Sequence, residues 1–266
     1  MVFLLSRLEQ KLSELRVASK KALVAYLVAG DPDLETTLEL MHGFVASGVD
    51  IIELGVPFTD PIAEGPIIQA AHDRALQTST SLDNIFDLVE EFRTKDSDTP
   101  IILMGYINTF LANSLALESI HERGTDAVLI VDIPGESTLA QIGINNTNIA
   151  SISLISPTTD RQRIEKICQT SSGFIYYVTL RGVTGASNLD VNEIETNITN
   201  IRMHTALPVL AGFGIKTSVD AQELSKVSDG VVIGSVLVDM IHQQSSQKDY
   251  KNIYTYLNEI SVAITQ

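Results

Sequence analysis

The chain has 266 residues, of which 44% are hydrophobic and 19% charged, so a large core can form and a disordered chain is excluded. Its net charge of −15 argues against nucleic acid or an anionic membrane as a general partner, and no apolar run is long enough for a membrane span. The single cysteine, Cys168, allows no internal disulfide and fits a reducing cytoplasm. We therefore expect one compact cytoplasmic domain over 1–266.

Apolar runs alternate with amphipathic segments along the chain, after a first segment of helical spacing over 1–16. The predicted strands are 22–28, 51–56, 101–106, 127–131, 149–155, 174–179, 208–211 and 230–233. The predicted helices are 34–46, 67–76, 82–93, 115–123, 137–142, 160–169, 191–204, 218–226, 236–242 and 250–264. Eight such alternations without a polar linker predict an α/β fold, a single (β/α)8 TIM barrel with an extra N-terminal helix. An open doubly wound sheet would need two edge strands, and apart from Glu53 no predicted strand has a charge or a proline in its middle.

The segment 50–66, DIIELGVPFTDPIAEGP, combines a strand with three carboxylates. Glu53 interrupts the apolar strand, and no Lys or Arg lies within ten residues of it, so a structural ion pair is the weaker explanation. Asp60 and Glu64 follow in a loop whose prolines and glycine limit its conformations. Because perturbed carboxylates gather at functional sites, this segment is predicted to hold catalytic acids.

The other strand ends restrict the chemistry, since active sites of such barrels lie at the carboxyl ends of the strands. No predicted strand contains a lysine, which excludes a Schiff base on a strand lysine. Every histidine falls on a helical pattern and is expected at the surface or at a helix end, so no metal site is predicted. These histidines are His42, His72, His121, His204 and His242. Carboxylates remain as the acid and the base.

Three glycine-rich turns, 182–185, 212–214 and 234–235, follow the last three predicted strands. This is the quadrant of the barrel in which backbone N–H groups and a helix N-terminus bind phosphate. Four aromatic residues lie at or near strand ends, where they would form a flat apolar pocket: Tyr26, Tyr106, Tyr176 and Phe213. The two features together predict a small substrate with an aromatic body and a phosphate tail.

Six motifs occur in one order over nearly the whole chain. They are ELGVPFTDPIAEGP at 53–66, MGYIN at 104–108, VDIP at 131–134, GVTG at 182–185, GFGI at 212–215 and GS at 234–235. With these motifs the chain resembles the tryptophan synthase alpha subunit family. The resemblance implies a lyase, classed with the carbon–oxygen lyases, that cleaves indole-3-glycerol phosphate to indole and glyceraldehyde 3-phosphate. It also implies an α2β2 complex in which indole passes to a beta subunit for tryptophan synthesis, with pyridoxal phosphate in the beta subunit and no cofactor in this chain.

The resemblance further implies roles for individual residues. Glu53 matches the acid that protonates the indole ring at C3, and Glu64 matches its acid/base partner at the indole nitrogen. The implied supporting residues are Asp60, Tyr176 and Thr184. The implied phosphate site is Gly185, Gly214, Gly234 and Ser235. The implied indole pocket is Tyr26, Met104 and Phe213.

Two positions depart from the family pattern. Glu64 stands where the family commonly has Asp, and Leu180 stands where it commonly has Arg, with Arg181 following. Glu keeps the charge of Asp but adds one methylene, so activity is still expected. The departures leave a second hypothesis open, a catalytically weakened alpha chain that acts mainly as an allosteric activator of its beta partner. A related phosphate-sugar isomerase without a partner is disfavoured by the aromatic pocket residues.

Overall fold

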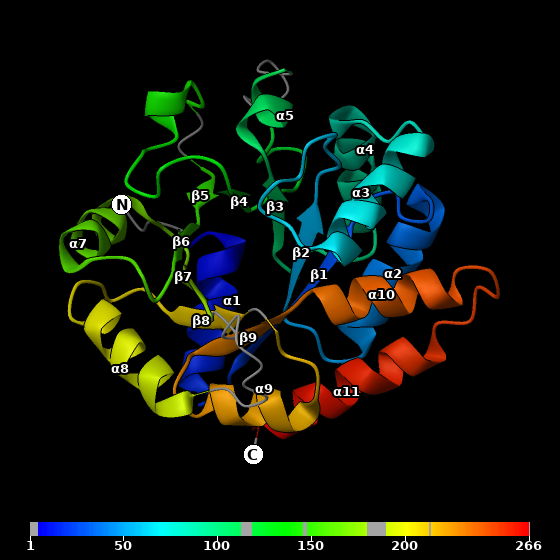
Figure 1. The fold of residues 1–266 in the computed structure, drawn as a ribbon. Coiled ribbons are helices and arrows are strands. Elements are labelled where there is room, and N and C mark those ends of the chain that lie inside the picture. The colour runs from blue at the N-terminus through cyan, green and yellow to red at the C-terminus, as the bar shows by residue number, and fades with distance from the viewer. Residues whose placement is uncertain (1–4, 113–118, 146–147, 180–189, 213, 266) are drawn as a thin grey trace.

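The computed structural model describes residues 5–112, 119–145, 148–179, 190–212 and 214–265. One parallel sheet lies at its centre, with its nine strands in the order β5-β4-β3-β2-β1-β9-β8-β7-β6 and helices around it (Figure 1). The strands are β1 (Ala22–Val28), β2 (Ile51–Gly55), β3 (Ile101–Gly105), β4 (Ala127–Ile130), β5 (Ala150–Ser151), β6 (Ser153–Ile155), β7 (Ile175–Val178), β8 (Val209–Gly212) and β9 (Gly230–Ile233). The predicted TIM barrel is confirmed.

The predicted fifth strand, 149–155, occurs as two short pieces, β5 and β6, on either side of Ile152. β5 pairs in parallel with β4, and β6 pairs in parallel with β7. One continuous segment therefore joins the two ends of the sheet. The nine strands occupy eight positions around the barrel, which agrees with the eight predicted alternations.

Most of the described helices have bounds close to those predicted. They are α1 (Arg7–Val17), α2 (Leu34–Ala46), α3 (Pro66–Gln77), α4 (Leu82–Arg93), α5 (Ile107–Leu111), the 3-10 helix η1 (Ala140–Ile142), α7 (Arg161–Thr170), α8 (Val191–Arg202), α9 (Ser218–Ser225), α10 (Ser235–Gln244) and α11 (Lys251–Thr265). None of the described helices is long and apolar enough to cross a membrane.

The prediction was wrong between the third and fourth predicted strands. The short helix α5 was not predicted, and the described end of the predicted helix 115–123 forms turns. The backbone N–H of Arg123 bonds to the carbonyl of Ser119 at 3.0 Å, but Gly124 then adopts a left-handed conformation with φ of 99°. That conformation ends the turn at Gly124. The part of the prediction over 113–118 lies outside the described residues.

Helix α1 covers the amino-terminal end of the barrel. The Ser6 side chain accepts a hydrogen bond from the Glu9 backbone, and the Glu9 side chain bonds back to the Ser6 backbone, so a capping box starts the helix. Leu8 and Leu12 are buried in a cluster with residues from the interior of the strands. Apolar side chains of α1 thus help to fill this end of the barrel.

Candidate active site

A cavity of about 160 Å³ lies at the carboxyl ends of the barrel strands. It is bounded by residues from β1, β2, β3, β6, β7 and β9, from loops that follow the strands and from the starts of α3 and α10. Eight of the residues predicted for the site line it: Tyr26, Glu53, Glu64, Met104, Tyr176, Gly214, Gly234 and Ser235. Segments that are far apart in the sequence thus meet around one space, as the barrel topology requires.

Glu53 enters the cavity from the middle of β2. It pairs in register with Tyr26 on β1 and with Ile102 on β3. The three side chains therefore lie on the same face of the sheet, which is the inner face of the barrel. The side chain is almost fully buried, and its Oε1 atom has no hydrogen-bond partner among the described residues. Burial, and then the nearby Glu64 carboxyl, raise the pKa of Glu53 to about 8. Glu53 therefore holds its proton at neutral pH and can act as an acid.

Glu64 reaches the same cavity from the loop between β2 and α3. Gly65 caps α3 in an extended conformation and Pro66 is its first residue, which fixes the start of the helix directly after Glu64. Burial raises the pKa of Glu64 to about 7. The two carboxyls thus titrate close to neutrality and are coupled, because ionising one disfavours ionising the other.

Tyr26 and Tyr176 lie near the two carboxyls, and their rings reach across to neighbouring strands. The Tyr26 hydroxyl lies against the backbone of Gly55, and a Cβ atom placed on Gly212 would be 2.5 Å from the Tyr176 hydroxyl. Only glycine fits at these two strand ends while the tyrosines keep these positions. Burial and the carboxyls raise both tyrosine pKa values well above their ordinary range, so the hydroxyls stay neutral donors.

The predicted phosphate side of the cavity is formed by Gly214, Gly234 and Ser235. Gly234 caps α10 without a side-chain hydrogen bond, and Ser235 is the first residue of that helix. The first N–H groups of a helix have no partner within it, and the helix dipole favours an anion at this end. An anion could therefore be held here by backbone groups. Five residues of the sequence argument lie outside the described residues: Leu180, Arg181, Thr184, Gly185 and Phe213.

A sequence model of the family described as "Tryptophan synthase alpha chain" matches residues 12–264. The chain belongs to the tryptophan synthase alpha chain family. It is 43% identical over 248 residues to the tryptophan synthase alpha chain of Alkalilimnicola ehrlichii, covering 92% of this chain and 90% of that relative. It is 42% identical over 269 residues to that of Thioalkalivibrio sulfidiphilus, covering 98% and 100%. The crystal structure of tryptophan synthase subunit alpha from Legionella pneumophila is similar with a TM-score of 0.90 and 36% identity, covering 98% of this chain and 99% of that one.

For this alpha chain, one histidine prediction was wrong. His72 was expected at the surface or at a helix end, but it is only 1% exposed, and its Nδ1 atom accepts a hydrogen bond from the Phe58 N–H at 3.0 Å. Burial lowers the pKa of His72 to about 4, so the ring is neutral and can accept. The spacing of Ile68, His72 and Ala75 on one face of α3 was the signal in the sequence.

Asp60, predicted as a supporting residue, does not line the cavity. Its side chain is exposed and accepts a hydrogen bond of 2.6 Å from the Thr59 hydroxyl. Glu64 is thus the loop carboxylate that faces Glu53. The apolar wall also has seven residues that were not singled out from the sequence: Ala63, Ile68, Val131, Leu154, Val178, Ile215 and Val232. Among the described residues, no group of three or more His, Cys, Asp or Glu side chains could hold a metal ion.

Proposed function

We propose that Glu53 and Glu64 of this alpha chain carry out the retro-aldol cleavage of indole-3-glycerol phosphate to indole and glyceraldehyde 3-phosphate. The observation that carries the proposal is a pair of buried carboxyls in one cavity, with pKa values of about 8 and about 7. At neutral pH such a pair supplies one protonated acid and one partly ionised base. General acid and base groups work best when their pKa values lie near the working pH.

The proposed reaction starts with transfer of the Glu53 proton to C3 of the indole ring, which forms an indolenine. The positive charge that develops at the ring nitrogen lies next to the Glu64 carboxylate, which stabilises it or takes the N–H proton and returns it when the electron pair enters the ring. Glu53, now ionised, accepts the proton of the side-chain hydroxyl. The bond between C3 and the hydroxyl-bearing carbon then breaks, and its electron pair returns to the ring. Indole and the aldehyde are the products, so no outside oxidant or reductant is required.

The rest of the cavity would hold the two ends of the substrate. The indole ring would lie against Tyr26 and Met104, with Phe213 assigned from its sequence motif. The phosphate would bind the backbone around Gly214, Gly234 and Ser235, with Gly185 again assigned from its motif. Tyr176 and Thr184 are proposed to support the carboxyls, and Asp60 to shape the loop that carries Glu64.

The proposal extends to the assembly. We place residues 1–266 in one catalytic domain that needs no cofactor of its own, because each step is a proton transfer or a bond cleavage. The family supports an α2β2 complex in the cytoplasm, in which a beta subunit with pyridoxal phosphate consumes the indole. A chain that only activates its beta partner is the alternative that the test below separates.

The test measures indole release from indole-3-glycerol phosphate by the wild-type complex and by Glu53→Gln in the same complex. We expect at least about a 10²-fold loss of kcat in the variant, since it keeps the shape of the side chain but not the proton. Beta-subunit turnover with added indole serves as the control for assembly and should stay near that of the wild-type complex. Wild-type indole release no faster than that of Glu53→Gln, with beta activation intact, would establish the activator alternative instead.

A further inference from the structure

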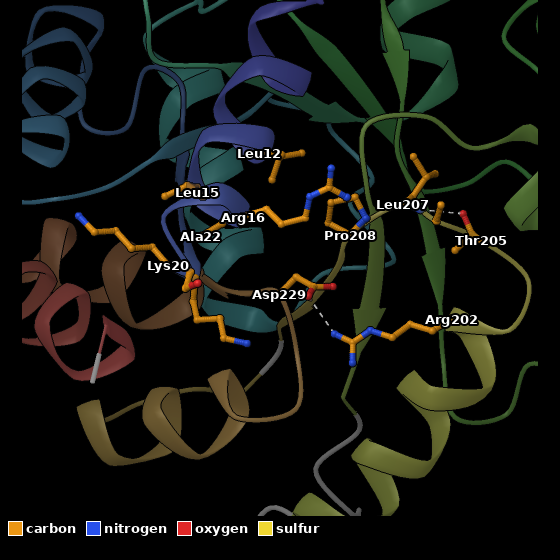
Figure 2. A pocket seen from close by; sticks show the side chains of 13 residues that line it. Leu12, Leu15, Arg16, Lys20, Ala22, Arg202, Thr205, Leu207, Pro208 and Asp229 are labelled. Carbon is orange, nitrogen blue, oxygen red and sulfur yellow. Dashed lines mark hydrogen bonds and ion pairs between the residues drawn. The ribbon is translucent and has the colours of Figure 1, made fainter.

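A second cavity, of about 540 Å³, lies at the amino-terminal end of the barrel (Figure 2). Its walls come from the second half of α1, the end of α8, and the segments that lead into β1, β8 and β9. The candidate active site is formed by the opposite ends of the strands. Among the residues that the structure describes, the two cavities have no lining residue in common.

The lining of this cavity is strongly cationic. Thirteen residues line it, and they include four of the 18 Lys and Arg residues of a chain whose net charge is −15. These are Arg16, Lys20, Lys21 and Arg202. Asp229 is the single carboxylate among the thirteen. The local charge therefore has the opposite sign to that of the whole protein.

Both carboxylate oxygens of Asp229 already accept hydrogen bonds from neighbouring residues. One carboxylate oxygen accepts a hydrogen bond of 2.9 Å from Arg202, and the other accepts 2.8 Å from the Val209 N–H. Lys21 donates through its Nζ atom to the Ser228 carbonyl at 2.7 Å, which leaves two further N–H donors. Burial lowers the pKa of Lys21, and the nearby Arg202 lowers it further, while Asp229 opposes them. An anion in the cavity would relieve this repulsion between the two cations.

Arg16 adds a further positive charge to this cavity. In Figure 2 its side chain extends from α1 toward Pro208, whereas Lys20 extends away from Asp229. Among the described residues, the Arg16 side chain has no ion pair and no hydrogen bond. With Lys21 and Arg202 it gives three positive charges against one carboxylate. The remaining charge of about +2 matches a phosphate monoester, which carries about −1.5 to −2 near pH 7.

An apolar surface lies beside these cations. It consists of Leu12, Leu15, Ala22, Leu207 and Pro208. The cavity volume falls within the range of roughly 300–1,000 Å³ that is usual for small-molecule sites, which combine apolar walls with a few polar groups. Arg16 and Arg202 are exposed, so a ligand could reach them from solvent and rest its apolar part on this wall.

We propose that this cavity is a second binding site, for a small organic phosphate whose anionic group contacts Arg16, Lys21 and Arg202 and whose apolar part packs on Leu12, Leu15 and Leu207. The site is independent of the catalytic proposal, because none of its residues belongs to the active-site cavity. The site lies between α1 and the starts of β1, β8 and β9. A bound ligand would therefore add a contact between the N-terminal helix and the barrel.

The test is an NMR titration of the full chain with phenyl phosphate at low salt, in which each amide reports its own surroundings. Saturable shifts are expected for amides at 16–22 and 205–207, separately from any shifts near Ser235. Arg16→Gln should weaken binding at these amides about tenfold, since a charge-assisted contact is lost. Inorganic phosphate should bind more weakly than phenyl phosphate, because it does not use the apolar wall.

The matched control is Arg161→Gln, the same substitution at an exposed residue on α7. It changes the net charge equally and should leave the dissociation constant within about twofold, because distant surface charges are screened. Equal weakening by the two variants would show a general charge effect and overturn the proposal. Shifts confined to the region of Ser235, or no saturable shift at 16–22 at millimolar phenyl phosphate, would overturn it as well.

Discussion

His72 and Phe58 are joined by a 3.0 Å hydrogen bond from the Phe58 backbone N–H to the Nδ1 atom of the buried imidazole. A second bond, 2.9 Å long, runs from the Ala63 N–H to the Tyr106 hydroxyl. The rings of Phe58 and Tyr106 are also stacked, with centroids 4.9 Å apart. The loop after β2 is thus held on both sides of its exposed turn, and Glu64 directly follows the second contact.

We expect His72→Leu to lower both stability and catalysis. Leucine leaves the Phe58 N–H without its acceptor, which costs about 1–3 kcal/mol where the group is buried. The freed loop positions Glu64 less well, and a misplacement of ~1 Å can cost up to ~10²-fold in rate. The measurements are the free energy of unfolding and the kcat for indole release. His72→Asn is the matched control, because its side-chain oxygen can replace Nδ1 as acceptor and should restore most of the activity. Equal losses in the two variants would contradict this role.

Tyr106→Phe tests the second contact of the loop. The change keeps the stacked ring but removes the acceptor of the Ala63 N–H. We expect a loss of about 1 kcal/mol in transition-state stabilisation, or roughly fivefold in kcat/KM, which is the usual value of one such hydrogen bond. Indole release measures it, and added indole at the beta subunit shows that assembly is intact. An unchanged kcat/KM would mean that the Ala63 contact does not position Glu64.

The sequence predicted the framework well because local signals define it. The bounds of β1 and α2 agree with the prediction, since an apolar run ends at Gly30, Asp31 and Pro32 and a helical pattern follows. Glu53 could be identified from the sequence because a carboxylate in an apolar strand without a nearby cation is costly to bury. Such a residue indicates a functional site. What could not be predicted depends on tertiary contacts. The sequence does not show that Asp60 points to solvent while Glu64 faces the cavity.

The raised pKa of Glu53 has a consequence for stability. Between its ordinary value of 4.5 and the folded value of about 8, the native protein holds a proton that the unfolded chain has released. Native stability therefore falls as pH rises through this window. Glu53→Gln removes the effect, so at pH 7 the variant should be more stable than wild type by roughly 3 kcal/mol, and at pH 4 about equally stable. Urea unfolding at the two pH values measures it. A stability difference that does not change with pH would contradict a raised pKa.

The two carboxyls also predict the pH dependence of turnover. Glu53 must be protonated and Glu64 ionised in the free enzyme, so kcat/KM should fall below about pH 7 and above about pH 8. The two apparent pKa values of this profile belong to the pair of carboxyls, because ionising one changes the pKa of the other. Steady-state rates of the complex between pH 5.5 and 9.5, a window set about 1.5 units beyond each limb, measure the profile. A rate that stays constant on the acid side of pH 7 would exclude Glu64 as the ionised base.

The identity of the base is the sharpest test of the site, since two carboxylates in one loop compete for the role. Glu64 is mostly buried and lines the cavity, whereas Asp60 is exposed and bonded to Thr59, so we assign the base to Glu64. Glu64→Gln should then lose most of kcat. Glu64→Asp keeps the charge but is shorter by one methylene, so the carboxylate falls short by ~1 Å and kcat should be intermediate, reduced by up to ~10²-fold. Asp60→Asn is the matched control, the same change of acid to amide in the same loop, and should reduce kcat less than Glu64→Gln. If Asp60→Asn proves far more damaging than Glu64→Gln, with equal phosphate binding in both variants, the base is Asp60 and the loop must rearrange to bring that side chain into the cavity.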